Sequence, residues 1–349
     1  MSDLWPPVVG ICGWKDAGKT ALIEALIPRL IERGLRVGVV KHDAHGLEVD
    51  RPGKDTDRFY KAGADVVAHD EQQRFARAHL TGPASLDDLA ARLGETCDLV
   101  LVEGHKASPV PKVWLGGEDE IEPPDDIGHL IGTVRPGLAL VDEALKTVLS
   151  QVEAFHKRLA VCAGVLIGGA STRMGRPKAL LPWRGATLLE HTVRIVEPWV
   201  ERIVFLGTGP VPTALADVPG VADAPGVEGP MAGVLAAVRW MPRARWLILP
   251  CDLPHLTNES VQWLLGQFHP GRHAVMPLLP DRASPEPLGA VYDLPARCSI
   301  ERAAAKRQFS LRHALPEEVV ATPHIPPNLA AAWQNINTPD EWHRLAGDT

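Results

Sequence analysis

The sequence predicts an α/β protein of two domains, each built on a mostly parallel sheet. The chain has 349 residues, which exceeds the roughly 100 to 200 residues typical of one domain. Short runs rich in Val, Ile and Leu alternate with amphipathic stretches of helical length, as they do in βαβ units. Each half also carries a glycine-rich basic loop directly after an apolar run, at residues 13–20 and 168–178. Two loops of this kind indicate two nucleotide sites, one in each domain.

Composition argues against several other classes of protein. Hydrophobic residues make up 45% and charged residues 23% of the chain, and no apolar run approaches the roughly 20 residues that span a bilayer. The first residues lack the features of a secretory signal, so we expect a cytoplasmic protein. A net charge of -7 argues against nucleic acid as a partner, because such binding needs a broad basic face. The five cysteines form no CxxC pair, which disfavours disulfides and structural zinc.

The expected elements follow from hydrophobic periodicity. In the first half we place strands at residues 8–12, 37–40, 99–103 and 112–115. Residues 142–159 have the pattern of one amphipathic helix rather than a flexible tether, and we place the domain boundary near residue 157. The predicted domains are therefore 1–157 and 158–349, with the role of residues 117–157 left open.

The second half repeats the alternation. We expect strands at residues 161–167, 202–206, 246–250, 273–278 and 288–292, and helices at 187–196, 231–240 and 260–268. The sequence TPDEW predicts a last helix, because it has Thr338 at the N-cap, Pro339 at the first helical position and Glu341 three residues after the cap. This is a capping box.

The first loop, GWKDAGKT, fits the phosphate-binding pattern GxxxxGK[ST] between a strand and a helix. Its backbone N–H groups and the helix dipole would hold phosphate oxygens, Lys19 would add a charge, and the Thr20 hydroxyl would bind Mg²⁺. Glu103 ends a later apolar strand, where a carboxylate can meet the metal through water. The residues predicted to bind this nucleotide are Gly13, Asp16, Ala17, Gly18, Lys19 and Thr20.

Three segments, GWKDAGKT, VKHDAHGLEVDRPGKDT…KAGA and DLVLVEGHK, together resemble the small GTP-binding adaptor protein of molybdopterin-guanine dinucleotide biosynthesis. The resemblance covers residues 7–116 and implies a P-loop NTPase-like sheet. It also implies GTP binding with slow hydrolysis, a helper role beside a guanylyltransferase, and a homodimer formed through this half.

The second loop, GGASTRMGRPK, does not fit the pattern GxxxxGK[ST] of the first loop, because no Ser or Thr follows Lys178. Gly168 and Gly169 would let backbone amides approach phosphates without a Cβ in the way. Arg173 and Lys178 supply positive charge, which transfer of a nucleotidyl group needs because charge develops on both the attacked phosphate and the leaving pyrophosphate. The alternative is a structural turn with incidental basic residues.

Such a transfer also needs a carboxylate that holds a divalent metal. Asp252 follows an apolar strand in LILPCDLPHL, where open α/β sheets bind their ligands. Mg²⁺ takes few protein carboxylates and completes its shell with phosphate oxygens and water. Asp223 is a second candidate, toward the nucleoside or as a further metal contact. The alternatives are a helix cap or turn for Asp252 and a surface turn for Asp223.

The second loop looks like the signature GGxSxRMGxxK of nucleotidyltransferases with a Rossmann-like nucleotide-diphospho-sugar transferase fold. Residues 161–345 resemble the molybdenum cofactor guanylyltransferase in LIGGASTRMGRPKALL, EGPMAGVLAAV, LPCDLPHL, SPEPLGAVYD and NINTPDEW. The resemblance implies that Asp252 binds both GTP and Mg²⁺, and that it acts in catalysis with Lys178 and Arg173. The GTP-binding residues it implies are Leu166, Ile167, Gly168, Gly169, Lys178, Asp223 and Asp252. Asn335 and Asn337 would lie near the pterin, or alternatively form a turn before the last helix.

Two positions depart from the family pattern. Leu206 stands where several members have Asn, and residue 177 is Pro rather than the common Asp. Related cytidylyltransferases have AAG where this chain has IGG, which favours guanine. The predicted reaction is transfer of GMP from GTP to molybdenum-molybdopterin, with release of pyrophosphate. The implied partners are GTP, the pterin substrate, a molybdopterin-delivering protein and molybdoenzyme acceptors.

Three alternatives remain at this point. The enzyme could be a molybdopterin cytidylyltransferase. The first half could be only a non-catalytic docking adaptor for the enzymes that receive the cofactor. The chain could also be a sugar-phosphate nucleotidyltransferase fused to a P-loop kinase.

Overall fold

The computed structural model describes residues 6–41, 50–79, 82, 84–117, 122–168 and 176–347. The chain divides into two compact units, Met1–Glu32 with Arg36–Gln151, and Arg33–Leu35 with Val152–Thr349. The division at residue 151 falls inside helix α4, Leu140–Lys157. Among the described residues, no helix has the length and apolar character needed to cross a bilayer.

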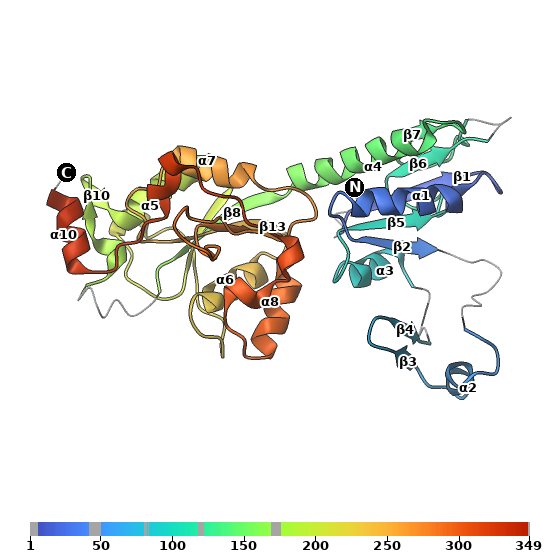
Figure 1. Ribbon diagram of the computed structural model, residues 1–349, viewed down its shortest axis with the longest axis horizontal. Helices are drawn as coiled ribbons and strands as arrows, with labels where there is room; N and C mark the ends of the chain where they lie inside the picture. Colours follow the sequence, from blue (N-terminus) through green and yellow to red (C-terminus); the bar gives the residue numbers. More distant parts are fainter. Residues whose placement is uncertain are drawn as a thin grey trace. The chain divides into compact units, whose positions relative to one another are not determined.

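The first unit is built on a five-stranded sheet in the order β2-β5-β1-β6-β7 (Figure 1). All neighbouring strands are parallel, which confirms the predicted sheet. The apolar side of helix α1, which carries the buried side chains Leu22, Ile23, Leu26 and Leu30, packs in the core. The strands are β1 (Val8–Gly13), β2 (Val37–Lys41), β5 (Leu99–Glu103), β6 (Lys112–Leu115) and β7 (Leu130–Val134), and the helices beside α4 are α1 (Lys19–Ile31) and α3 (Leu86–Leu93).

Helix α2 (Asp55–Lys61) and an antiparallel ribbon of β3 (Val66–His69) and β4 (Arg74–Arg77) form a small substructure within this unit. The nearly buried Asp57 carboxylate joins its parts, because it accepts hydrogen bonds from Lys61 Nζ at 2.8 Å, Gly53 N at 2.8 Å and Arg77 Nη1 at 3.2 Å. These donors, Lys61 first, lower the pKa of Asp57 to about 2. One carboxylate therefore fastens the helix to the ribbon.

The second unit has a seven-stranded sheet in the order β12-β11-β8-β13-β15-β14-β16. Strand β15 runs antiparallel to both of its neighbours, and the other pairs are parallel. The predicted mostly parallel sheet is thus confirmed. The strands are β8 (Ala160–Leu166), β11 (Arg202–Leu206), β12 (Gly220–Val221), β13 (Ala244–Pro250), β14 (Ala274–Val275), β15 (Ala290–Tyr292) and β16 (Val320–Ala321).

Helices cover both faces of this sheet, and each face has its own core. On one side α6 and α8 pack against the sheet around Trp246 and Tyr292. On the other side α5 and α7 pack together, and α7 contributes Val261 and Leu264 to the core. The helices are α5 (Leu188–Val196), α6 (Pro230–Trp240), α7 (Asn258–Gly266), α8 (Ala296–Ala305), α9 (Leu311–Ala314) and α10 (Pro339–Gly347).

A buried ionic cluster fastens the C-terminal end of α4 to the second unit. His156 on α4 has its Nδ1 3.4 Å from Asp293 Oδ2, and Arg245 Nε lies 3.1 Å from Asp293 Oδ1. The Arg245 guanidinium also stacks on Phe268, with Cζ 3.5 Å from the ring centroid. Asp293 is only 2% exposed. Such a buried carboxylate is tolerated only with charged and hydrogen-bonding partners.

Candidate active site

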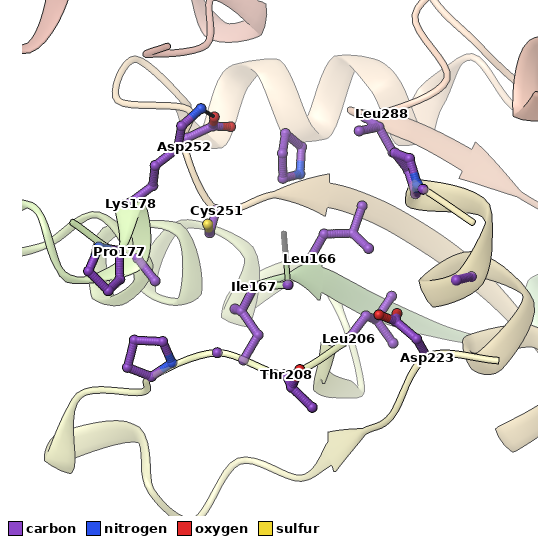
Figure 2. Close-up of a pocket in the computed structure, with 18 of the residues that line it drawn as sticks. Leu166, Ile167, Pro177, Lys178, Leu206, Thr208, Asp223, Cys251, Asp252 and Leu288 are labelled. Atoms are coloured by element: carbon purple, nitrogen blue, oxygen red, sulfur yellow. Dashed lines mark hydrogen bonds and ion pairs between the residues drawn. The ribbon is translucent and has the colours of Figure 1, made fainter. Parts of the chain in front are cut away.

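The second unit has a cavity of about 670 Å³ at the edge of the sheet where β8, β11 and β13 end (Figure 2). These strands are parallel neighbours, and their last residues Leu166, Leu206 and Pro250 lie in register across the sheet. Side chains that follow each strand in the sequence therefore meet here. The lining includes Leu166, Ile167, Gly168, Arg176, Lys178, Leu206, Thr208, Asp223, Cys251, Asp252 and Leu288.

Lys178 and Asp252 face each other in the wall of this cavity (Figure 2). Lys178 begins the short 3-10 helix η1 (Lys178–Leu180), and Asp252 follows β13. The lysine Nζ donates to Asp252 Oδ2 at 2.6 Å and to Asn337 Oδ1 at 3.1 Å. The two residues are 74 positions apart in the sequence, and the fold brings them together as predicted.

Asp252 is suited to hold a metal. The residue is 6% exposed, and its Oδ1 is buried with no hydrogen-bond partner among the described residues. A buried carboxylate oxygen without a partner is costly unless a ligand satisfies it. Mg²⁺ prefers oxygen ligands of this kind. Within the part of the chain that the structure describes, no group of three or more His, Cys, Asp or Glu side chains is arranged around a common metal position. At sites with so few protein ligands, Mg²⁺ completes its shell with phosphate oxygens and water.

Glycines form the part of the wall that lies beyond β8 and β11. Gly207 has φ 84°, and a Cβ there would lie 3.1 Å from Gly168 Cα. At Gly209 a Cβ would lie 2.4 Å from the Ile167 carbonyl oxygen. The two loops can approach this closely only because the side chains are absent. Gly168 was predicted from the sequence, whereas Gly207 and Gly209 were missed although both occur in the short segment GTG.

Asp223 lies in the cavity wall away from the Lys178 and Asp252 pair (Figure 2). A Cβ built on Gly168 would come within 3.7 Å of Asp223 Oδ2, so this carboxylate borders the second loop. Leu206 is fully buried in the core and presents no polar group to the cavity. Thr208, two residues later, carries a hydroxyl in the same wall.

Two predicted residues of the second loop, Gly169 and Arg173, lie outside the described residues. Arg176, in the same basic loop, lines the cavity. It was not predicted, because the sequence motif assigned the positive charges to Arg173 and Lys178. Asn337 contacts Lys178, whereas the Asn335 side chain is exposed.

Cys251 also lines the cavity, but it is a poor nucleophile. Burial raises the pKa of its thiol to about 12, with the neighbouring Asp252 carboxylate acting in the same direction. Only the thiolate attacks phosphorus or carbonyl centres efficiently. The cavity therefore offers charge and positioning rather than covalent catalysis by this residue.

The loop of the first unit joins β1 to α1. Gly18, with φ 87°, precedes the helix, and Asp16 has φ 62°. The Thr20 hydroxyl lies 3.1 Å from both carboxylate oxygens of Glu103, so the two predicted metal-binding residues meet. Lys19 Nζ donates to the Trp14 carbonyl oxygen at 2.6 Å.

The close packing of this loop also depends on glycine. A Cβ at Gly13 would lie 2.7 Å from the Leu115 carbonyl oxygen. The Ala17 amide turns back to the Trp14 carbonyl oxygen at 3.3 Å. The loop thus has the strand, turn and helix N-terminus that a phosphate cradle needs.

Comparison with known proteins identifies the two parts of the chain. The family described as molybdopterin guanine dinucleotide synthesis protein B matches residues 8–125. The family described as the MobA-like NTP transferase domain matches residues 163–320.

Individual relatives agree with this division. The molybdopterin-guanine dinucleotide biosynthesis adapter protein of Haemophilus influenzae is 40% identical over 142 residues, 40% of this chain and 80% of that protein. The adapter protein of the same name from Escherichia coli is 37% identical over 150 residues, 42% of this chain and 79% of that protein. A protein of Bacillus mycoides named "probable molybdenum cofactor guanylyltransferase" is 35% identical over 140 residues, 38% of this chain and 69% of that protein. In its first part the chain belongs to the family of molybdopterin-guanine dinucleotide biosynthesis adapter proteins, in its second part it belongs to the molybdenum cofactor guanylyltransferase family, and it is a fusion of the two.

Proposed function

We propose that the second unit transfers GMP from GTP to the terminal phosphate of molybdenum-molybdopterin and releases pyrophosphate, and that the first unit is a GTP-binding adapter for this synthesis. The names of the relatives in both families support the substrates. The observation that carries the proposal is the Lys178 and Asp252 pair, which lies where three parallel strands end and retains a buried carboxylate oxygen without a partner among the described residues.

The chemistry needs positioning and charge. A phosphate monoester is already largely ionised near neutral pH, so its oxygen can attack the α-phosphorus of GTP without a protein nucleophile. The new P–O bond forms at the α-phosphorus, the bond to the bridging oxygen breaks, and its electron pair leaves with pyrophosphate. The Lys178 ammonium would neutralise charge that grows on these phosphates.

A bound Mg²⁺ would supply further charge neutralisation at the phosphates, and Asp252 would hold it. The Oδ1 atom of Asp252 is the oxygen that fits this role, because it is buried and has no hydrogen-bond partner among the described residues. In the first unit, Thr20 and Glu103 would hold the corresponding ion, the threonine by its hydroxyl.

Guanine is the proposed base because relatives of both halves take part in guanine dinucleotide synthesis or guanylyl transfer. Asp223 would face the nucleoside, since it borders the cavity away from the Lys178 and Asp252 pair (Figure 2). Carboxylate oxygens accept hydrogen bonds, so Asp223 suits donors such as ribose hydroxyls or the N–H groups of guanine.

The test is a side-by-side incubation of the purified protein with molybdenum-molybdopterin, Mg²⁺ and either GTP or CTP. We expect pyrophosphate release with GTP to exceed that with CTP by at least about a hundredfold, because a site built to hydrogen-bond one base leaves polar groups unpaired with another. Chromatography identifies the product. A preference for CTP would make the enzyme a cytidylyltransferase, and turnover with a panel of sugar 1-phosphates instead of the pterin would contradict the proposed acceptor.

Lysine substitutions should separate the two nucleotide sites. Lys178→Ala is expected to weaken GTP binding in the second unit by roughly a hundredfold, because it removes a charge-assisted contact to phosphate, and to leave the other site unchanged. Lys19→Ala should do the reverse. Calorimetric titration of each variant with GTP measures both sites.

The same two variants test the role of the adapter. If Lys19→Ala keeps dinucleotide synthesis in the purified system while cofactor insertion falls in cells, the first site controls delivery rather than chemistry. If Lys178→Ala instead abolishes binding at the first unit, the assignment of sites to units is wrong.

A further inference from the structure

The segment just before the last helix contacts both members of the Lys178 and Asp252 pair. The Ile336 amide donates to the Asp252 carbonyl oxygen at 3.2 Å, and Asn337 Oδ1 accepts from Lys178 Nζ at 3.1 Å. Lys178 and Asn337 are 159 positions apart. The chain therefore returns to the cavity after completing the sheet, and it places an amide oxygen on the lysine.

This contact fixes the direction of a free donor. A lysine ammonium has three N–H donors in tetrahedral arrangement. Among the described residues, Asp252 Oδ2 and Asn337 Oδ1 accept two of them. Because two directions of a tetrahedral group determine the third, the remaining N–H is oriented before a phosphate arrives. Lys178 then loses little further side-chain entropy on binding.

Glu341 holds Asn337 in place. Its Oε2 accepts from the Asn337 amide at 2.7 Å and from the Thr338 amide at 3.2 Å. In return the Glu341 amide donates to Thr338 Oγ1 at 3.3 Å. The hydrogen bond from the Asn337 amide is the main reason why the pKa of Glu341 lies below its ordinary value. The capping box of α10 thus acts on the residue that contacts Lys178.

The same segment is anchored by apolar packing. Ile336 is 1% exposed, and it lies in one cluster with Trp183 and Trp342. The cluster also contains Leu181 and Leu188, which follow η1. The packing of its side chain therefore holds Ile336 in this cluster. Asn337 is exposed, and the hydrogen bond from its amide to Glu341 holds its backbone in place.

We propose that Glu341 is a positioning residue for nucleotide binding: through the Asn337 amide it orients Asn337 Oδ1, which with Asp252 Oδ2 directs the ammonium of Lys178 at a nucleotide phosphate. The proposal rests on the function proposed for the second unit. Glu341 itself does not touch the substrate. The last helix is in this way a part of the nucleotide site and not only a cover of the apolar cluster.

A second capping box in the same unit provides the matched control. At the start of α5, Glu190 Oε2 accepts from the Thr187 amide at 2.7 Å and from its hydroxyl at 2.8 Å. The Thr187 hydroxyl accepts from the Glu190 amide at 3.2 Å. In both boxes the glutamate accepts from the amide of the N-cap threonine, and the threonine hydroxyl accepts from the amide of the glutamate. Among the described residues, Thr187 and Glu190 form no hydrogen bond with Lys178 or Asp252. Glu190→Ala therefore removes an equivalent cap without the link to the lysine.

The experiment compares Glu341→Ala, Glu341→Gln and Glu190→Ala in the full-length protein, with thermal unfolding, GTP binding and pyrophosphate release measured for each. We expect Glu341→Ala to raise the KM and Kd for GTP roughly fivefold to tenfold, because a lysine that is no longer held in place must be ordered when the phosphate binds. Glu341→Gln should restore the wild-type KM, since its amide oxygen still accepts from both N–H groups. Glu190→Ala should lower the unfolding temperature comparably and leave KM unchanged.

A double variant that carries Glu341→Ala and Asn337→Ala tests whether Glu341 acts through Asn337. If Glu341 acts through Asn337, Glu341→Ala raises KM no further in a protein that already carries Asn337→Ala, whereas independent effects multiply. Equal KM values for Glu341→Ala and Glu190→Ala, or multiplying effects in the double variant, would overturn the proposal. A wild-type protein that binds GTP but releases no pyrophosphate with the pterin would instead contradict the proposed reaction, and the binding data would still decide the role of Glu341.

Discussion

Replacing Asp252 with asparagine is expected to lower guanylyl transfer by at least about a thousandfold while the protein stays folded. Asparagine has nearly the same shape, but it lacks the charge that pairs with Lys178 at 2.6 Å and offers a neutral amide in place of a carboxylate. Mg²⁺ binds carboxylate oxygens far better than amide groups in such a site. The loss should therefore appear in kcat as well as in the affinity for the metal.

The measurement is pyrophosphate release over a range of Mg²⁺ concentrations, with circular dichroism to verify the fold. Asp217→Asn is the control, because Asp217 is an exposed aspartate at the depression beside β12 and has no part in the proposed chemistry. Turnover of Asp252→Asn at the wild-type rate, with an unchanged dependence on the Mg²⁺ concentration, would rule out Asp252 as the metal ligand.

Asp293→Ala is expected to cause the largest loss of stability, about 3 to 5 kcal/mol for the second unit. The carboxylate is 2% exposed and lies between His156 and Arg245. Removing it leaves the buried guanidinium of Arg245 without its counter-ion. The exposed pair of Glu301 and Arg239, with 2.5 Å between the charged atoms, provides the contrast, because Glu301→Gln should cost no more than about 1 kcal/mol.

The pH dependence of stability should change in the same variant. Burial alone would raise the pKa of Asp293, but the interactions with His156 and with the positive charge of Arg245 outweigh it, and the pKa lies below the ordinary 3.8. A carboxylate with a depressed pKa stabilises the folded state above its unfolded pKa, and this contribution is lost as the pH falls through the folded value. The wild-type protein should thus lose stability below about pH 4 more steeply than Asp293→Ala.

Denaturant unfolding at several pH values measures both effects. The two units need not unfold together, so tryptophan fluorescence should be fitted with separate transitions. The transition of the first unit serves as an internal reference, since Asp293 belongs to the second. A variant that unfolds at the wild-type denaturant concentration would show that the buried cluster contributes no net stability.

Local sequence patterns predicted the strands that carry the site, because each is a short run of apolar residues. Asp252 follows β13, and Lys178 lies in the basic loop after β8. A parallel sheet then brings such residues to one edge. The predicted strand at 273–278 is shorter than expected, since only Ala274–Val275 pairs regularly. Pro277 has no N–H to donate. Among the described residues, the pairing beyond it continues only on the β16 side, where the Leu278 amide donates to the Pro323 carbonyl oxygen at 2.9 Å and Leu278 forms an isolated bridge with His324.

Contacts between distant segments could not be predicted. Nothing in the sequence near Asn337 indicates that its side chain reaches Lys178, because such a contact depends on the path of the whole chain and not on local periodicity. The close approach of Gly207 to Gly168 could not be predicted from the sequence for the same reason. Strand β7 was missed because only Val134, at its end, is buried, so it lacks the apolar run that identified the other four strands of the first sheet.

The reversed direction of β15 determines which residues of its segment line the cavity beside Leu288. Because β15 runs against β13, the segment that enters it, and not the one that leaves it, lies at the catalytic edge, and Leu288 accordingly lines the wall. Gly289, with φ 68°, lies against Trp333, whose Nε1 donates to its carbonyl oxygen at 2.9 Å. Further hydrogen bonds hold the loop that leads into β15, because Arg312 Nε donates to the Pro285 carbonyl oxygen at 2.8 Å and the Tyr292 hydroxyl donates to the Pro287 carbonyl oxygen at 2.7 Å. None of these bonds involves Lys178 or Asp252, so a substitution in this loop should reshape the wall beside Leu288 and leave the lysine and the carboxylate in place.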